Sequence, residues 1–360
     1  MKSIAILTTR SITHNRFLGS ITNELKKMFK ITLACKDISN LERFLNISTY
    51  QIDFPSNIYE IFDIKRNFVF CKQILDLINK VDLIYVHTPI AAHYLRIIKF
   101  IFGKNIEIVY HIHGLRYLPG KYNFKSILFR FIELVLSTQA NIFIVINNLD
   151  YLSIIKYVNP NNVYLVKGVG IELPKNVLLN KKNRDFFIIG VIGSFKSEKG
   201  YLQLIEIAKK LSEFKDIYFQ VYGNGNVNWI ENKIKKNKLK NIKINGFVNN
   251  IENQIENFDI FLHPSHREGL NVSIQECLGM GIPVITTNVR GCRDLIINGY
   301  NGFIYDVYDV DKASEHILKL YNMNFLQFNE LRKNCVNYAR KHLDRKKLSI
   351  KIADIFKNVA

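Results

Sequence analysis

The stretch Glu268-Gly269-Leu270-Asn271-Val272-Ser273-Ile274-Gln275-Glu276 separates two carboxylates by seven residues. The apolar run Ile260-Phe261-Leu262 before it predicts a buried strand, and the segment Pro283-Val284-Ile285 after it predicts another. Glu268 then falls in a loop at the carboxyl end of a strand, and Glu276 falls about two turns into the helix that follows. Ligands of an open parallel sheet bind at that edge. The stretch therefore predicts a ligand site in a parallel α/β fold.

The chemistry of this stretch suits a ligand that joins a polyol to an anion. A carboxylate can accept hydrogen bonds from neighbouring hydroxyls, and the backbone amides at a helix N-terminus can hold an anion. Two carboxylates that flank one helix N-terminus can therefore bind both parts of a nucleotide sugar.

Short apolar runs alternate with helical patterns along almost the whole chain, which indicates parallel sheets. A loop-like stretch, Lys167–Arg184, interrupts the alternation once. We expect two Rossmann-like domains facing each other across a cleft, over residues 1–170 and 185–340, with a linker over 171–184 and a C-terminal helix over 341–360 that packs back toward the first domain. The expected strands are Ile4–Leu7, Ile31–Ala34, Leu83–Val86, Ile106–Tyr110, Ile142–Ile146, Phe186–Ile192, Tyr218–Tyr222, Ile242–Ile244, Asp259–Leu262 and Pro283–Thr286. In the first half, the expected helices are Phe17–Phe29, Phe68–Lys80, Ala91–Phe102 and Lys125–Ser137. In the second half, helices are expected to begin near Gly200, Asn228, Ile251 and Val272. The last ~50 residues are expected to be entirely helical.

The composition limits the class of protein. Of 360 residues, 48% are hydrophobic, which is enough for two packed cores. Fifty Lys and Arg against 31 Asp and Glu give a net charge of +19, which favours acidic partners or, equally, reflects a solvated basic surface. The five cysteines lie far apart, so we expect a reducing compartment and no thiolate zinc site. We expect a soluble or peripheral protein, because the chain opens on a short strand and has no run of ~18 apolar residues.

A second candidate site follows the strand expected at Phe186–Ile192. The segment Gly193-Ser194-Phe195-Lys196-Ser197-Glu198-Lys199-Gly200 has small residues that admit a phosphate and a lysine that supplies charge. The segment matches neither the Gly-x-Gly-x-x-Gly motif nor a P-loop. The chain therefore lacks the motif expected of a simple dehydrogenase or of an ATPase. A solvated Lys199 is the plainer interpretation. Gly223 and Gly225 follow the next strand, where they make a tight turn or leave space for the base of a nucleotide.

A third candidate is Tyr110-His111-Ile112-His113-Gly114, at the end of a strand. Histidine donates, accepts and transfers protons near neutral pH. His111 and His113 share one face of the strand, but no third ligand follows at a suitable spacing, so we do not expect zinc. A structural, hydrogen-bonded role is the preferred interpretation for His111.

Two apolar segments contain interspersed cations, over residues 94–104 and 121–131. Such helices can lie in a membrane interface, although helices that face a Rossmann core have a similar composition. The core interpretation is favoured for the first segment, and the second is the better candidate for a membrane or acceptor contact.

Taken together, these motifs resemble retaining glycosyltransferases of family 4, which have the GT-B fold, over nearly the whole chain. The C-terminal half has the most specific matches, which are Glu268/Glu276, Gly193 through Gly200, Gly223/Gly225, and the runs Arg290-Gly291-Cys292-Arg293-Asp294 and Asn298-Gly299-Tyr300-Asn301-Gly302-Phe303. The N-terminal half resembles the branch that builds bacterial surface polysaccharides on lipid carriers, at His87-Thr88-Pro89, His113-Gly114, Glu133, Ile146 to Asp150 and Gly168 to Ile171.

The resemblance implies roles for both domains and for individual residues. Residues 1–170 would bind the acceptor and residues 185–340 the nucleotide-sugar donor. Glu276 would bind the ribose and Glu268 the transferred sugar, while Lys199 would neutralise the leaving diphosphate and His113 would lie by the anomeric carbon. The catalytic set is then His113, Glu268 and Lys199. The donor-binding set is Gly193, Ser194, Lys196, Lys199, Gly223, Gly225, Glu268, Gly269, Leu270, Asn271, Glu276 and Arg290. The family uses no metal and no cofactor beyond the donor itself.

The chain departs from the family pattern at Ser194, where an arginine usually follows the first glycine. We expect Lys196, Arg290 or Arg293 to supply the missing charge. The family's glycine pair in the first loop is also replaced, by the segment Thr8 to Arg16.

The resulting expectation is a retaining, metal-independent transferase that moves an N-acetylhexosamine or hexose, UDP-linked, to a lipid-linked glycan in O-antigen, capsule or related polysaccharide synthesis. It would act in the cytoplasm, peripherally on the anionic inner face of the plasma membrane, without nucleic acid. One alternative is a nucleotide-sugar 2-epimerase of similar fold. Another is a basic nucleic-acid-binding protein, for which no binding motif is found.

Overall fold

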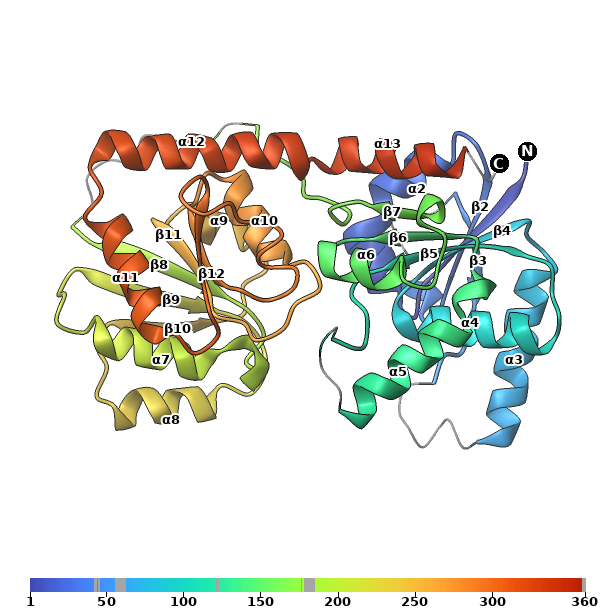
Figure 1. Ribbon diagram of the computed structural model, residues 1–360, viewed down its shortest axis with the longest axis horizontal. Helices are drawn as coiled ribbons and strands as arrows, with labels where there is room; N and C mark the ends of the chain where they lie inside the picture. The colour runs from blue at the N-terminus through green and yellow to red at the C-terminus, as the bar shows by residue number, and fades with distance from the viewer. Residues whose placement is uncertain are drawn as a thin grey trace. The chain divides into compact units, whose positions relative to one another are not determined.

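The structure, a computed structural model, describes residues 1–41, 44, 46–55, 63–118, 120, 123–175, 177 and 185–357. Most of the expected linker, and Pro119, Lys121 and Tyr122 before the second basic apolar segment, lie outside the described residues. The chain forms two compact units, one of Met1–Val169 with Arg345–Ala360 and the other of Gly170–Asp344 (Figure 1). The first unit is therefore built from both ends of the sequence.

The first unit has a sheet of seven parallel strands in the order β3-β2-β1-β4-β5-β6-β7. Its strands are β1 Ser3–Leu7, β2 Lys30–Cys35, β3 Ser48–Gln51, β4 Leu83–His87, β5 Glu107–Ile112, β6 Ile142–Val145 and β7 Val163–Leu165. Its α-helices are α1 Ser11–Thr13, α2 Gly19–Leu25, α3 Ile64–Ile78, α4 Pro89–Ile101, α5 Phe124–Val135, α6 Asn148–Ile154 and α13 Arg345–Phe356.

Alternate residues of the strands supply the two faces of this sheet. Ala5 and Leu7 pack in one core with α3 and α4. Ile4 and Ile6 pack in the other with α2 and α13, where Phe356 of α13 is fully buried. This alternation is what a strand buried on both faces requires.

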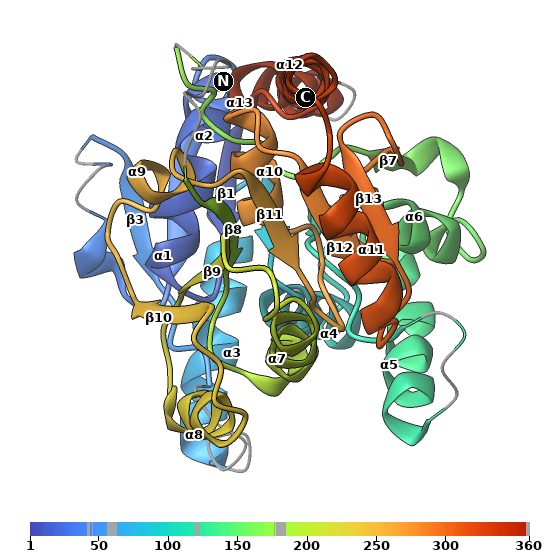
Figure 2. The same ribbon diagram turned by 90° about the vertical axis from the view of Figure 1, so that its left-hand side faces the viewer.

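The second unit has a sheet of six parallel strands in the order β10-β9-β8-β11-β12-β13, with helices on both faces (Figure 2). Its strands are β8 Phe187–Ile192, β9 Ile217–Tyr222, β10 Ile242–Gly246, β11 Ile260–His263, β12 Val284–Thr287 and β13 Gly302–Tyr305. Its α-helices are α7 Tyr201–Lys210, α8 Asn228–Lys236, α9 Glu252–Ile255, α10 Val272–Gly279, α11 Val310–Tyr321 and α12 Phe325–His342.

Each sheet has a point where the strand order reverses, between β1 and β4 and between β8 and β11. The loops after such neighbouring strands leave in opposite directions, and ligands of doubly wound sheets bind in the crevice between them. The loops after β8 and β11 contain Lys199 and Glu268. The topology thus brings two of the expected site residues to one edge.

The structure confirms two Rossmann-like sheets and a helical C-terminal region, and it corrects several details. The strands β3, β7 and β13 were not expected. β3 is an exposed edge strand without an apolar run, β7 has only three residues, and β13 begins at a glycine. The helix expected over Phe17–Phe29 is a π-helical turn, His14–Leu18, followed by α2, which ends at Leu25. Glu276 is the fifth residue of α10, so it lies just beyond the first turn rather than two turns in.

Candidate active site

The loop after β11 is shaped by a capped helix. β11 ends at His263, and α10 begins at Val272. The side chain of Asn271 accepts a hydrogen bond from the backbone N–H of Ile274 at 2.8 Å, which is a regular N-cap. The cap fixes the entry of α10 and, with it, the end of the loop that contains Glu268.

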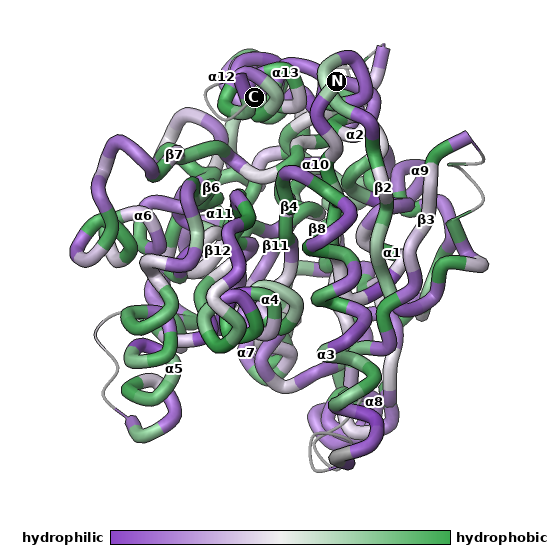
Figure 3. Tube along the Cα trace, turned by 90° about the vertical axis from the view of Figure 1, so that its right-hand side faces the viewer, coloured by the Kyte–Doolittle hydropathy of each residue, from purple (hydrophilic) through white to green (hydrophobic). Residues whose placement is uncertain are grey.

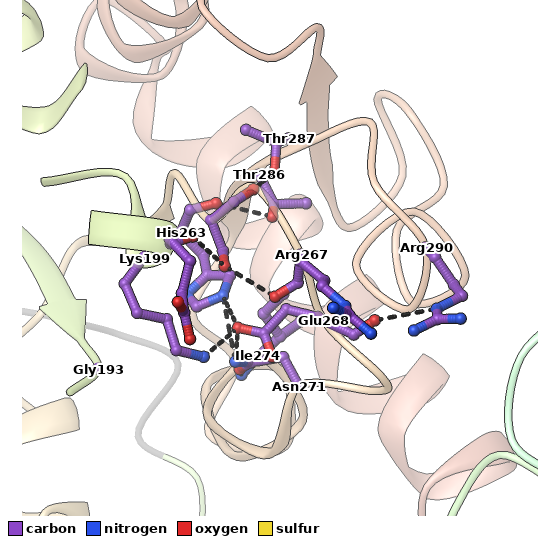
Figure 4. A network of polar contacts seen from close by, with 12 residues as sticks. Gly193, Lys199, His263, Arg267, Glu268, Asn271, Ile274, Thr286, Thr287 and Arg290 are labelled. Carbon is purple, nitrogen blue, oxygen red and sulfur yellow. Dashed lines mark hydrogen bonds and ion pairs between the residues drawn. The ribbon is translucent and has the colours of Figure 1, made fainter. Parts of the chain in front are cut away.

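Glu268 is the centre of a polar network in this unit (Figure 4). Its Oε1 accepts hydrogen bonds from Lys199 Nζ at 2.6 Å, His263 Nε2 at 2.8 Å and Asn271 Nδ2 at 3.1 Å. Because a carboxylate only accepts, the proton of His263 must be on Nε2, and Asn271 then donates to Glu268 rather than to the ring. Within the described residues, no hydrogen bond to Oε2 is found, so this oxygen is available to a ligand.

The electrostatics keep Glu268 ionised. Burial alone would raise the pKa of its carboxyl group, but the hydrogen bond and charge of His263 and the ammonium of Lys199 outweigh burial and lower the pKa to about 2. The side chain of Glu268 is only 12% exposed, and that of Lys199 is 22% exposed. The site therefore holds a fixed negative charge beside a fixed positive one.

The glycine loop after β8 packs against the loop after β9. A Cβ at Gly223 would lie 1.8 Å from the carbonyl oxygen of Gly193, so only glycine allows this approach. A Cβ at Gly193 would meet nothing nearer than 3.5 Å. Tyr201 donates from its hydroxyl to the Gly193 carbonyl at 2.6 Å, and Phe195 N–H donates to the Asn224 carbonyl at 2.7 Å. Gly223 thus serves the packing of two loops.

Arg290, one of the three candidates for the missing charge, contacts the Glu268 loop. It is 5% exposed and donates from Nε to the backbone carbonyl of Glu268 at 3.2 Å. The next residue, Gly291, has a φ of 80°, and a Cβ there would lie 2.1 Å from the Gly269 carbonyl oxygen. Lys196 and Arg293 are both exposed.

The other expected donor residues lie around this network or on its loops. Glu276 is half-buried on α10, and Gly269 and Leu270 are half-buried in the loop before it. Ser194 is half-buried after β8, and Gly225 has a φ of 112° in the loop after β9. The network itself joins residues from the loops after β8, β11 and β12.

His113 lies in the first unit, just beyond β5, and the chain turns after it at Gly114, which has a φ of 124°. A third histidine lies beside His111 and His113, and it comes from an earlier strand, so the spacing after His113 did not reveal it. His87 ends β4 and pairs in register with His111 of β5, so three histidines place ring nitrogens within 4.8 Å of one another.

The ring geometry does not favour a shared metal. The rings of His111 and His113 are stacked, with centroids 4.4 Å apart and planes 19° from parallel. Metal-binding lone pairs lie in the ring plane, so those of stacked rings run side by side instead of converging on one point. The cluster therefore has the composition of a metal site without its geometry.

Two residues of these sites were assigned no role from the sequence, although Asp150 lies in the matching stretch Ile146 to Asp150. His263 is 2% exposed and bonds Glu268, and its only signal was its position as the polar last residue of an apolar strand. Asp150, on α6, is fully buried and accepts hydrogen bonds from Leu115 N–H at 3.1 Å and from Asn147 at 2.8 Å. It fixes the segment that follows His113 and Gly114.

Among the described residues, no helix is both long and apolar enough to cross a membrane.

Comparisons with known proteins agree with this architecture. Residues 176–342 match the family model of glycosyl transferases group 1. The chain is 25% identical over 355 residues, 92% of this chain and 89% of the relative, to the UDP-Gal:alpha-D-GlcNAc-diphosphoundecaprenol alpha-1,3-galactosyltransferase of Escherichia coli. It is 28% identical over 350 residues, 91% of this chain and 88% of the relative, to the capsular polysaccharide biosynthesis glycosyltransferase CapM of Staphylococcus aureus.

A solved structure, that of HepE of Anabaena in complex with UDP-glucose, has the same fold, with a TM-score of 0.78. The two chains are 16% identical, and the match covers 99% of this chain and 100% of HepE. The sequence matches, the two parallel sheets and the polar network at the strand-order reversal lead to one conclusion. Residues 176–342 match the group 1 glycosyltransferases, the two sheets have the GT-B fold, and the chain is a glycosyltransferase.

Proposed function

We propose that the protein transfers a hexose or N-acetylhexosamine from a UDP-linked donor to a lipid-linked glycan, with retention of anomeric configuration, in the synthesis of a bacterial surface polysaccharide. The observation that supports the donor site most is the contact of Lys199 with ionised Glu268 at the strand-order reversal of the second unit. The E. coli relative is named for a UDP-linked donor and a diphosphoundecaprenol-linked acceptor, and the S. aureus relative for capsule synthesis.

The proposed chemistry follows from charge. When the sugar–phosphate bond breaks, negative charge develops on the diphosphate and positive charge on the sugar ring. A fixed cation at the diphosphate, from Lys199 with Arg290, lowers the barrier because it needs no reorganisation as the charge develops. Glu268 holds sugar hydroxyls through Oε2, and Glu276 holds the ribose. These protein charges do the work of a divalent cation, so the proposal needs no metal and no cofactor besides the donor.

Retention is proposed to arise from attack on the same face that the diphosphate leaves. The acceptor hydroxyl then approaches beside the departing phosphate, which can take its proton. His113 lies by the anomeric carbon in this proposal.

The proposal assigns contact with an anionic membrane to α5. Six apolar side chains of this helix are exposed, and Phe124 (83%) and Phe131 (61%) are exposed most; the others are Ile127, Leu128, Leu134 and Val135. Figure 3 shows the helix as largely hydrophobic. Lys125 and Arg130 are exposed beside them. An exposed apolar helix face with flanking cations is typical of interfacial helices.

The opposite side of α5 is anchored in the first unit. Glu133 is 2% exposed and pairs with Arg96 at 2.9 Å and His93 at 2.7 Å, both on α4. These contacts fix which side of α5 is buried, so the apolar side remains exposed.

The experiment incubates the protein with radiolabelled UDP- and GDP-sugars and membrane lipid extracts, and determines the anomeric configuration of the product. Labelled lipid from a UDP-sugar, with an unchanged anomer, is expected. Glu276→Ala is expected to abolish transfer while the circular dichroism spectrum is retained. Unchanged kinetics in this variant would contradict the donor assignment, and epimerised nucleotide sugar formed from donor alone would support a 2-epimerase.

A further inference from the structure

The histidine cluster at the strand-order reversal of the first unit contains a residue that the proposed reaction does not use. His87 is fully buried as the last residue of β4, and its Nδ1 lies 2.9 Å from Nε2 of His113. The two ring centroids are 5.2 Å apart with planes 28° from parallel, which fits rings joined edge to edge through the bonded nitrogens. The hydrogen bond therefore lies close to both ring planes, where the nitrogen lone pair points.

The environment of His87 assigns the direction of this hydrogen bond. A neutral imidazole has one N–H and one bare nitrogen. Nε2 of His87 is buried and has no partner in the described part of the chain. Buried N–H groups without an acceptor are rarer than buried acceptors without a donor. The proton of His87 is therefore assigned to Nδ1, and His87 donates to His113.

The assignment fixes the tautomer of His113. Because its Nε2 accepts from His87, the proton of His113 must be on Nδ1. Nδ1 of His113 is not among the buried, unpartnered side-chain atoms of the described residues, whereas Nε2 of His87 is. The N–H of His113 is therefore the one that an incoming ligand can reach.

His87 is held rigidly. Its ring packs on that of Tyr85, with centroids 4.2 Å apart, and its strand position pairs with His111. Thr88, which follows it and precedes α4, has a φ of 67°, a strained backbone for a β-branched residue. Strained residues of this kind cluster where a functional group must be fixed in place.

We propose that His87 is a positioning residue, which fixes the rotation and the tautomer of His113 so that His113 presents an Nδ1–H donor to an oxygen of the transferred sugar or the acceptor. The inference rests on the proposed function, in which His113 lies by the anomeric carbon.

Two substitutions of His87 separate positioning from packing. Asparagine at this position places its amide nitrogen near the position of Nδ1 and keeps the donor, whereas leucine fills similar volume without one. His87→Leu is expected to lower kcat by about tenfold to a hundredfold, as a misplaced reacting group does, with little change in the Kd for UDP. His87→Asn is expected to retain most of the kcat.

A double-mutant cycle adds a stricter control. In a His113→Ala background, His87→Leu is expected to have no further effect, because the residue that it positions is gone. Equal loss of kcat in both backgrounds, or equal loss in His87→Asn and His87→Leu, would overturn the proposal.

The ¹⁵N resonances of the imidazole rings test the tautomer without any activity. His113 is expected to be protonated at Nδ1 in the native protein, and to lose this preference in His87→Leu but not in His87→Asn. A native His113 protonated at Nε2 would overturn the inference even if sugar transfer is found. If instead no sugar is transferred while the tautomer is as expected, the proposed function fails and the positioning contact stands.

Discussion

Lys199 Nζ lies 2.6 Å from Glu268 Oε1, although 69 positions separate the two residues in the chain. The contact exists because β8 and β11 are neighbours in the sheet, and the loops that follow them meet. Lys199 is thus already held in place before a diphosphate binds. A lysine has three donors, so it can keep its bond to Glu268 and still reach a phosphate oxygen.

Lys199→Met removes the ammonium and keeps most of the side-chain length. We expect kcat to fall by about 10²–10³, because a fixed charge at the leaving group is lost. Glu268 still accepts from His263 and Asn271, so the fold should remain intact by circular dichroism. Lys199→Arg keeps the charge and is expected to recover part of the rate. A kcat in Lys199→Met equal to that of the native protein would rule out this role.

Arg290→Gln removes the charge but retains an N–H that can bond the Glu268 carbonyl. We expect a loss of kcat of about tenfold or more and a weaker affinity for UDP by titration calorimetry. Lys196→Ala and Arg293→Ala test the other two candidates for this charge, whose side chains are both exposed. If Lys196→Ala lowers the rate and Arg290→Gln does not, the compensating charge comes from Lys196.

The buried histidines of the first unit, which are the cluster and His14, predict a pH-dependent stability. Burial lowers the pKa of His14 and of His113 to about 4, and lowers the pKa values of His87 and His111 well below 6.5. The unfolded chain therefore binds protons near pH 6.5 that the folded chain excludes. The contribution of these histidines to the free energy of unfolding is complete above pH 6.5 and is lost as the pH falls toward 4. The free energy of unfolding then changes by up to about 1.4 kcal/mol per pH unit for each histidine.

Urea unfolding measured between pH 7.5 and 5 checks this expectation. This pH range lies above the titration of Glu268. Because the pKa of Glu268 is lowered in the folded protein, its protonation reduces the stability only below about pH 4.5. His14→Phe, which replaces one buried ring by another that does not titrate, should reduce the slope. A free energy of unfolding that stays constant over this range would show that the rings are not excluded from protonation.

Replacing Phe124 and Phe131 by serine should weaken attachment to vesicles. Each buried apolar side chain of this size contributes roughly 1.5–3 kcal/mol, so the double variant should no longer float with vesicles that contain anionic lipid. Leu326→Ser, at an exposed position of α12 (79%), is the control for general loss of surface hydrophobicity. Equal flotation of the native protein and the double variant would exclude α5 as the attachment site.

Chelation should leave the reaction rate unchanged. The proposed diphosphate contacts are cations of the protein, and the rings of His111 and His113 are stacked rather than convergent. We expect the same kcat after dialysis against EDTA and after addition of Mg²⁺ or Zn²⁺. A rate that falls on chelation and returns with one of these ions would show that a metal takes part.

The alternation of apolar runs and helical patterns was enough to predict both sheets, because a strand buried on two faces reads as a continuous apolar segment. The same rule explains two of the three strands that were missed. β3 has the burial pattern of an exposed edge, and β7 has only three residues. Edge strands bury one side or none, so they leave little hydrophobic signal.

The candidate sites were predictable only where one motif contained the chemistry. Glu268 and Lys199 each lie in a recognisable segment, but their contact depends on the pairing of β8 with β11. The hydrogen bond between His87 and His113 likewise depends on the pairing of β4 with β5. His263 could not be assigned, since a histidine at a strand end has no distinctive pattern until its partner is known.

The helix α13 closes the core of the first unit from the far end of the chain. Phe356 packs edge-on against Phe29 at 6.2 Å and Tyr85 at 4.8 Å, and Tyr85 in turn bonds His111 at 2.7 Å. During synthesis, the ribosome must therefore translate the entire second unit before the first can complete its interior. A nascent chain halted at Val169 would leave Phe29 and Tyr85 without the cover of Phe356, because α13 is translated only after the second unit.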